Sequence, residues 1–123
     1  MTGSEKRDAI LQAALMVIAE RGLHDAPMSL IAQRSGASAG TIYHYFTSKD
    51  DLIHALYRHV KTIFNRALSA GYSPTLAREV AFRQMWLNAY RFYRTHLNES
   101  RFIDQYENSP YYHVQLPEGE IVE

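Results

Sequence analysis

Polar and cationic side chains of the types that contact nucleic acid lie close together between residues 38 and 49. Thr41, Tyr43 and His44 carry a hydroxyl, a phenol and an imidazole within four positions, and Lys49 follows one to two helical turns later. Short or planar polar groups can hydrogen-bond to base edges, and a cation can neutralise a phosphate. The segment therefore has the residue types needed to bind DNA, provided that the fold presents them together.

The sequence around these residues predicts two short helices, over 27–35 and 39–46, joined by a tight turn. A helix-turn-helix needs a small residue in its first helix, a turn residue that tolerates positive φ, and an early apolar residue in its second helix. Ala32, Gly36 and Ile42 meet these needs in that order. The N-terminal end of the second helix would then enter a major groove.

The rest of the chain is also predicted to be helical. Apolar residues recur at three- and four-residue spacing, and the predicted helices cover residues 4–21, 49–70, 75–97 and 101–106. Ser48 and Asp51 have the spacing of a capping-box variant at the start of the second of these. From Asn108 onward no regular element is predicted. The fold class is all-α, with a helix-turn-helix head over residues 1–48 and a long connecting helix followed by further helices over 49–123.

Composition excludes several classes of protein. The 123 residues contain 46% hydrophobic residues and no cysteine, which fits a single core without disulfides or thiolate chemistry. The net charge of +0 gives no general attraction to nucleic acid, so DNA affinity must come from local placement. The longest apolar run near the N-terminus, residues 13–19, is too short to span a bilayer. We expect a soluble cytoplasmic protein without a membrane segment.

An enzyme is not expected either. The sequence has no Gly-x-Ser-x-Gly elbow and no paired acids in a plausible pocket. His54 and His59 are five residues apart, whereas a helical metal pair requires ligands four apart. We predict no catalytic residue, no metal and no cofactor.

The segments Ile10–Gly22 and Ile31–Leu56 resemble the N-terminal domain of the TetR family of transcriptional regulators. The most specific part of the resemblance is the series Gly36-x-Ser38-x-Gly40-Thr41-x-Tyr43-x-Tyr45-Phe46-x-x-Lys49-x-x-Leu52. The resemblance implies a sequence-specific DNA-binding regulator, a repressor released by a small-molecule effector, which binds a palindromic double-stranded operator as a homodimer. The later helices fit the order of the family's ligand-binding core but carry no sharp motif. The resemblance implies that residues 49–123 form a connecting helix with an incomplete ligand-binding and dimerisation domain.

The resemblance also implies roles for individual residues. Those expected at or near base edges and the adjoining backbone are Ser38, Ala39, Gly40, Thr41, Tyr43 and His44. Tyr43, Tyr45 and Lys49 are expected to contact phosphates, although Tyr45 is equally compatible with a packing role. Where the family has a Thr or Ser cap on the second helix, this sequence has Ala26 and Pro27, so Ser29 is a weaker substitute for that phosphate contact.

A row of aromatic residues in the predicted fifth helix has two interpretations. Phe82, Trp86, Tyr90 and Tyr93 could form bundle core, which is the more frequent role for aromatics at helical spacing. They could instead line an effector pocket, to which Phe64, Met85 and Tyr106 would contribute. The effector would then be apolar or aromatic, since no fixed cluster of charge is available for an ionic one.

Two alternatives remain open from the sequence. Members of the resembled family generally have further helices that pair two subunits, so we expect this chain to be a truncated form with exposed apolar faces on the predicted fourth and fifth helices; otherwise an unusual surface must form the dimer. The functional alternative is a helical protein-interaction module, or a non-functional fragment, without DNA binding. The operator, the effector and the regulated genes are not encoded in any motif.

Overall fold

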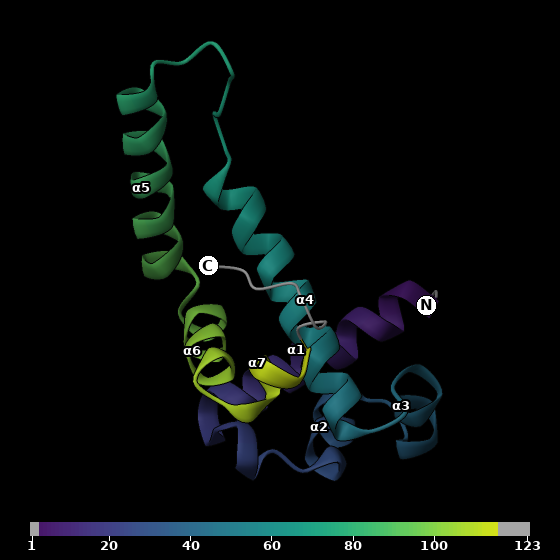
Figure 1. The fold of residues 1–123 in the computed structure, drawn as a ribbon. Coiled ribbons are helices and arrows are strands. Elements are labelled where there is room, and N and C mark those ends of the chain that lie inside the picture. The colour runs from purple at the N-terminus through teal and green to yellow at the C-terminus, as the bar shows by residue number, and fades with distance from the viewer. Residues whose placement is uncertain (1–2, 116–123) are drawn as a thin grey trace.

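In the half of the molecule drawn at the bottom of Figure 1, which we call the lower half, helix α1 (Gly3–Arg21) lies at the centre of the packing. It contacts α2 (Met28–Ser35), α4 (Lys49–Leu68) and α6 (Leu97–Glu107), so it is covered on more than one side, as its broad apolar surface predicts. Its buried residues are Ile10, Leu11, Ala13, Ala14, Leu15, Val17 and Ile18. This computed structural model describes residues 3–115, with side chains described as far as Tyr112.

Glycine ends α1 and α2, as predicted. Gly22 has φ 89° and its N–H donates to the Ile18 carbonyl at 2.7 Å. The connector that follows contains a short 3-10 turn over Leu23–Asp25. Gly36 has φ 74° and follows α2. Both glycines adopt the left-handed conformation that residues with a Cβ disfavour, so each fixes where its helix ends.

The long helix α4 begins with the predicted cap. The Ser48 hydroxyl accepts a hydrogen bond from the Asp51 N–H at 3.1 Å, and the Asp51 carboxylate accepts one from the Thr47 N–H at 3.0 Å. The N–H groups of Thr47 and Asp51 have no carbonyl partner within α4, so these two side-chain hydrogen bonds replace the missing backbone bonds. The helix ends at Leu68, two residues earlier than predicted.

The C-terminal helices differ from the prediction in their bounds. Helix α5 covers Arg78–Thr95, and α6 begins two residues later at Leu97, because the chain bends only at His96 (φ −122°, ψ 65°). The prediction of irregular chain from Asn108 was wrong in part, since α7 spans Pro110–Gln115. Pro110 occupies the first position of α7, where its missing N–H costs nothing. The prediction for residues 116–123 lies outside the described residues.

A tyrosine at the end of α6 joins the C-terminal helices to α4. Tyr106 has no exposed surface, and its ring stacks on that of Tyr57 with 3.9 Å between centroids. Its hydroxyl lies 2.9 Å from Nδ1 of His54. Burial raises the pKa of Tyr106 to about 12, because the phenolate would lose its hydration there.

Two further polar contacts fasten α6 and α7 to the lower half. The Gln105 side-chain oxygen accepts a hydrogen bond from the Leu23 N–H at 3.1 Å, across 82 residues of sequence. The Tyr111 hydroxyl donates to Asp50 at 2.9 Å. Burial and the neighbouring Asp50 carboxylate both raise the pKa of Tyr111. These contacts hold the C-terminal helices beside the start of α4.

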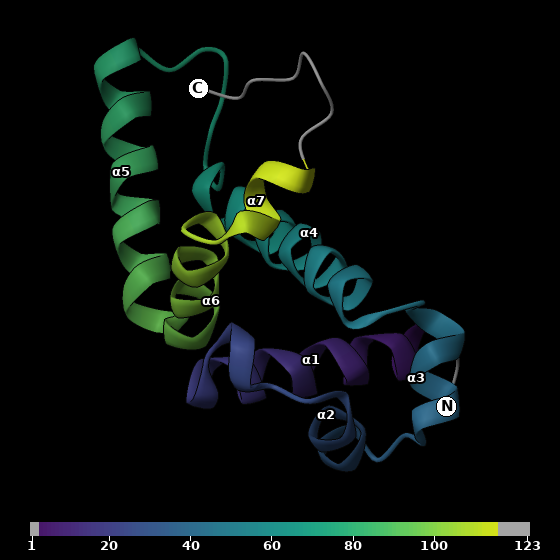
Figure 2. The same ribbon diagram turned by 60° about the horizontal axis from the view of Figure 1, so that its bottom comes forward.

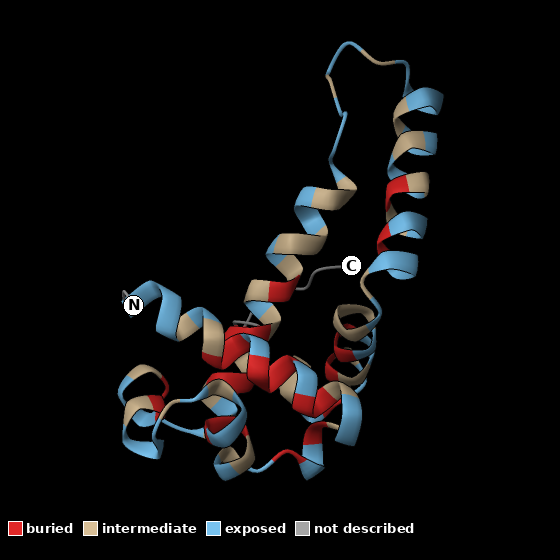
Figure 3. Ribbon diagram, turned by 180° about the vertical axis from the view of Figure 1, so that it is seen from behind, coloured by how far each residue is buried: buried red, intermediate tan, exposed pale blue. Residues whose placement is uncertain are grey.

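Burial divides the molecule into two parts. Helices α4 and α5 run side by side away from the lower half (Figures 1 and 2). The buried core residues gather in the lower half, whereas no residue between 61 and 87 is buried (Figure 3). We call residues 61–87 the arm. In the described residues 3–115, no helix has the length and apolar character needed to cross a bilayer.

Candidate nucleic-acid interface

The turn between α2 and α3 (Ala39–Tyr45) is fixed by local hydrogen bonds. The Ser38 Oγ accepts from the Thr41 N–H at 3.1 Å and lies 2.9 Å from the Thr41 hydroxyl. Ser35 contributes a second anchor, since its Oγ accepts from the Ala37 N–H at 3.2 Å. The start of α3 is therefore pre-organised. Ser38 has a capping role here in addition to the base-edge role that the resemblance implies.

Helix α3 has one packed face and one open face. Ile42 is completely buried and Phe46, just beyond the helix, is 2% exposed. The opposite face is open, as the helical wheel predicts. Its exposed residues are Ala39, Gly40, Tyr43 and His44, and Thr41 is partly exposed. The Tyr43 side chain is 52% exposed, so it is accessible to a partner. The open face can reach a groove without any rearrangement of the core.

Tyr45 lies between the two faces. Its side chain is half-buried and packs against the core, and its ring contacts His44 edge-on with 5.1 Å between centroids. Its hydroxyl is close to the start of α1, since a Cβ at Gly3 would be 3.3 Å from it. Both interpretations of Tyr45 stay open, because a ring that packs can still present its hydroxyl at the edge of the interface.

Lys49 stands at the first position of α4, beside the Ser48 cap. The free N–H groups of a helix start and a lysine ammonium both favour an anion. Each neighbouring acid has another partner, Asp51 in the cap and Asp50 in the bond to Tyr111. The role of Asp50 is therefore to fasten α7 and not to cap α4. Of the three salt bridges found in the described chain, none uses Lys49.

The first turn of α2 lacks the cap that the family pattern has. Pro27 occupies the N-cap position with φ −70° and ψ 147°, and no side chain accepts a hydrogen bond there. Ser29 is exposed on the following turn. A phosphate contact by Ser29 is geometrically available but remains a prediction.

A lysine that the sequence reasoning missed lies beside the turn. Lys6 of α1 lines a depression of about 390 Å³ together with Gly36, Ser38 and Thr41. Lys6 precedes the buried Ile10 by one helical turn, which was the available signal that it faces the same side. Arg7 is next to it, with its guanidinium 5.3 Å from the Phe46 ring centroid. The start of α1 therefore places the Lys6 cation beside the turn, although Glu5 and Asp8 balance the charge of Lys6 and Arg7.

Arg34 of α2, by contrast, is already neutralised. Its guanidinium forms two hydrogen bonds with the Glu20 carboxylate, at 2.9 and 3.1 Å. This pairing lowers the pKa of Glu20 and raises the pKa of Arg34. The exposed pair joins α1 to α2 and leaves Arg34 less available for a phosphate.

The residues predicted to line an effector pocket do not come together in one cavity. Phe82 and Met85 line a cavity of about 340 Å³ between the end of α4 and the start of α5, with walls from Leu68, Leu76 and Ala81. Trp86, Tyr90 and Tyr93 are 60%, 49% and 48% exposed on the outer side of α5. None of the three belongs to the buried core, although the Tyr93 ring lies 6.0 Å from that of Phe64 on α4 and Trp86 borders a shallow hollow formed by α5 itself.

The other two candidates belong to the interior. Tyr106 is fully buried beneath α4 and α7, and Phe64 is half-buried with its ring 5.0 Å from that of Phe92. A ligand role for the whole set therefore stays a prediction. The described residues contain no group of three or more His, Asp or Glu side chains arranged to hold a metal ion.

Comparison with known proteins links this geometry to one family. Residues 10–56 match the family model described as bacterial regulatory proteins, tetR family. An HTH-type transcriptional regulator of Haemophilus influenzae is 30% identical over 103 residues, which are 84% of this chain and 55% of that protein. The regulator BetI of Proteus mirabilis is 43% identical over 58 residues, which are 47% of this chain and 29% of that protein.

Solved structures of regulators from the same family have a similar fold. A TetR-family transcription regulator from Shewanella sp. PV-4 superposes with a TM-score of 0.80 at 30% identity, covering 86% of this chain and 56% of that one. One from Haemophilus influenzae gives 0.78 at 29% identity, covering 87% and 58%. The chain thus spans about half the length of these relatives. Its helix-turn-helix sequence, its all-helical fold and its relatives lead to one conclusion: the chain belongs to the tetR family of bacterial regulatory proteins.

Proposed function

We propose that this chain is a sequence-specific DNA-binding transcriptional regulator of the cytoplasm, whose reading head is formed by α1, α2, α3 and the start of α4. The observation that carries the proposal is the open face of α3. It presents Thr41, Tyr43 and His44 beside a capped helix start, while Ile42 holds the opposite face in the core. Side chains of these types at the N-terminal part of a reading helix suit base edges in a major groove.

Phosphate contacts would position that helix. Lys6 of α1 lies beside the turn, Lys49 stands at the start of α4, and Tyr43 and Tyr45 of α3 add hydroxyls. The chain has a net charge of +0, so this local charge has to supply the affinity. The charge distribution supports binding of one defined DNA surface and not general adhesion to polyanions.

We infer repression at a palindromic operator, which requires two heads about one DNA turn apart (~34 Å) and hence a dimer. We infer release by a small apolar or aromatic effector. The apolar cavity of about 340 Å³ beside Phe82 and Met85 supports that ligand class, because its size is within the range of small-molecule sites.

The test begins by selecting binding sites from a randomised duplex library with the full 123-residue chain. Affinity for the selected duplex is then measured by fluorescence anisotropy at increasing salt. Specific binding with a steep salt dependence is expected. Binding without sequence preference, or without salt dependence, would overturn the proposal.

Matched variants assign the roles. Lys49→Ala should weaken binding to all sequences alike and reduce the salt slope by about 1, since one phosphate contact is lost. Lys61→Ala is the control, because Lys61 lies in the second half of α4 and pairs with Glu107 of α6. Thr41→Ala should relax preference at one base position, whereas Thr62→Ala, which removes another partly solvated threonine hydroxyl, should not. The reverse pattern would contradict the assignment.

A further inference from the structure

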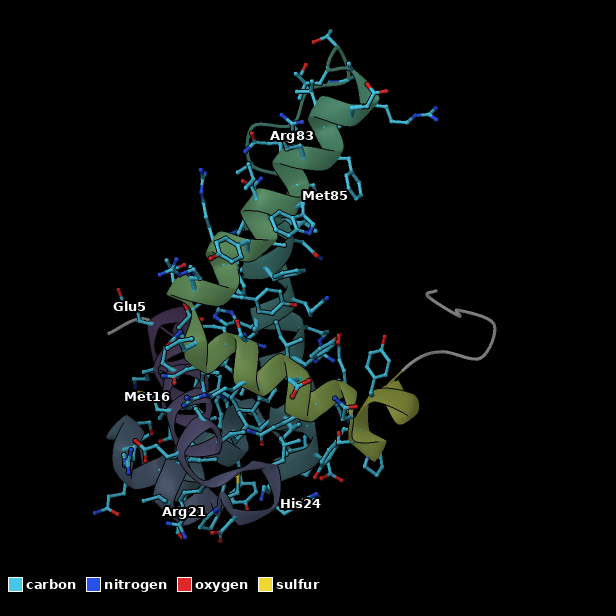
Figure 4. All side chains as sticks on the ribbon, turned by 90° about the vertical axis from the view of Figure 1, so that its left-hand side faces the viewer. Glu5, Met16, Arg21, His24, Arg83 and Met85 are labelled. Carbon is cyan, nitrogen blue, oxygen red and sulfur yellow. The ribbon has the colours of Figure 1, made fainter. Side chains whose placement is uncertain are left out.

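The cavity between the end of α4 and the start of α5 combines apolar walls with one charged residue. All its lining residues belong to the arm, so we call it the arm cavity. Its apolar walls come from both helices and from the connection between them: Leu68, Leu76, Ala81, Phe82 and Met85. Met85 lies on the upper part of α5 (Figure 4). Among the described residues that line the cavity, Arg78 is the only charged one, and none is acidic.

Hydrogen bonds hold the walls of the arm cavity in place. The Asn88 amide donates to the carbonyls of Leu68 and Ala70 at 3.0 and 2.8 Å, which fixes α5 against the end of α4. The Gln84 amide donates to the Asn88 side-chain oxygen at 3.0 Å. In the connection, the Tyr72 N–H donates to the carbonyl three residues earlier at 3.0 Å. The cavity is therefore formed before a ligand enters, so binding has few side chains to order.

The volume of the arm cavity limits the size of its ligand. About 340 Å³ corresponds to roughly eleven groups the size of a water molecule, at about 30 Å³ each. A ligand of about ten non-hydrogen atoms therefore fills it, such as a straight chain of about eight carbons with a small head group. Because the walls are mostly apolar, the chain of such a ligand is bound by removal from water.

Arg78 decides which head group is favoured. Its side chain is exposed, and of the salt bridges found in the described chain none uses it. A ligand seated on the apolar walls removes part of the water around the guanidinium, which costs free energy unless a new partner replaces that water. A carboxylate replaces it with charge-assisted hydrogen bonds that a neutral group cannot match. An ammonium group is repelled, because no acidic residue of the cavity balances Arg78.

We propose that the arm cavity binds an apolar carboxylate, with a chain of about eight carbons against its walls and the carboxylate paired with Arg78. Tyr72 lines the same cavity and is 64% exposed, so its hydroxyl is available as a second donor to the carboxylate. This narrows the apolar or aromatic effector inferred above to an anionic one. The regulatory meaning of the ligand rests on the proposed function, whereas the binding site itself does not.

The test is therefore made without DNA, on the full 123-residue chain. Isothermal titration calorimetry at neutral pH and low salt compares three probes that share one alkyl chain: octanoate, octan-1-ol and octylammonium. Octanoate should bind at one site, at least about threefold more tightly than octan-1-ol, and octylammonium should bind most weakly. Added salt should weaken the binding of octanoate and leave that of octan-1-ol unchanged, because only the charged contact is screened.

Arg78→Gln should weaken octanoate binding by at least about threefold and leave octan-1-ol binding unchanged, because only the charged contact is lost. Arg83→Gln is the matched control. Arg83 is an exposed arginine of the same helix (Figure 4), but it does not line the cavity and lies about 140° further around α5. Ala81→Leu should weaken octanoate and octan-1-ol alike, because it fills the cavity. Circular dichroism checks that each variant keeps the fold.

Three results would overturn the proposal: no binding of octanoate below the concentration at which it forms micelles, equal affinity for octanoate and octan-1-ol, or equal weakening by Arg78→Gln and Arg83→Gln. Octanoate binding that a folded Ala81→Leu variant leaves unchanged would place the ligand elsewhere, which also overturns it. A chain that binds octanoate as expected but binds no duplex would leave this inference standing and reject the proposed function. Specific duplex binding without octanoate binding would do the reverse.

Discussion

Two regions of the molecule have a similar local structure, residues 28–46 and residues 61–87. Each contains parts of two helices joined by a connection with a positive-φ glycine. They differ in how far their apolar side chains are covered. In the first region, Ile31, Ala32, Ile42 and Phe46 all pack into the core. In the second, no residue is buried, and Phe82 and Trp86 face solvent. The difference lies in the neighbours. In the head, α2 packs along α1 and α3 packs on α2, whereas in the arm α4 and α5 have each other as their main neighbours.

The comparison shows what a helix pair needs. Two helices can bury only the strip between them, because each is amphipathic on a face wider than one contact. A third helix, here α1, covers the rest in the head. The arm instead depends on the Asn88 hydrogen bonds and on the rings of Phe64 and Phe92 at its base.

The largest effect is expected from the head. Ile42→Ala should lower the free energy of unfolding by about 2–5 kcal/mol, because it opens a cavity at a completely buried position. Urea unfolding followed by circular dichroism measures it. A loss below about 1 kcal/mol would mean that the head core is less tightly packed than the structure indicates.

The next effect tests the join between the arm helices. Asn88→Ala should cost about 1–3 kcal/mol, because two backbone carbonyls lose a buried donor. Hydrogen exchange should accelerate at the start of α5 and the end of α4 and stay unchanged in α1. Asn65→Ala, at an exposed position of α4, is the control. Equal acceleration in α1 would contradict the division into head and arm.

A smaller effect is expected where the C-terminal helices meet α4. Tyr106→Phe should cost about 0.5–1.5 kcal/mol, since it removes the hydroxyl that contacts His54. The pKa of Tyr106 is raised from 10.0 to about 12, so its neutral form is favoured in the folded state. That stabilisation is complete below pH 10 and is lost as the pH rises through 12.

The measurement for this residue is the unfolding midpoint between pH 9 and 12, in the wild type and the variant. The wild type should lose stability over the upper part of that range, and Tyr106→Phe should lose less. Identical pH profiles for the two proteins would contradict the buried phenol. Tyr43→Phe, at an exposed position, is the control.

The smallest effect is expected in the arm. Phe82→Ala should change the free energy of unfolding by less than about 0.5 kcal/mol in dilute solution, because the side chain is mostly in water. A loss of several kcal/mol that does not depend on concentration would show that Phe82 is covered within one chain.

The local features of the fold were predictable from the sequence. Gly22 and Gly36 end their helices, Ser38 and Ser48 begin theirs, and the wheel of residues 39–46 separates Ile42 from His44 correctly. These features depend on neighbours within four residues, so spacing alone determines them. The helix over Pro110–Gln115 was missed because six residues with only a proline start signal carry too little periodicity.

Long-range placement was not predictable in the same way. Spacing shows that Phe82 and Trp86 share a face, but it cannot show whether anything packs on that face. It also does not reveal that Tyr106 is buried against Tyr57, that Tyr111 bonds to Asp50, or that Lys6 lies beside the turn.

The sequence by itself determined the helical class, the reading head and the family, because capping, turn conformation and helical periodicity are local properties. The tertiary structure decided which apolar faces are covered. Helix α2 is covered because α1 packs along it, and the side chains of Phe82, Trp86 and Tyr90 stay mostly exposed because no described element packs over them. Burial depends on which elements from elsewhere in the chain pack against a helix, and that information is not contained in the spacing of one helix.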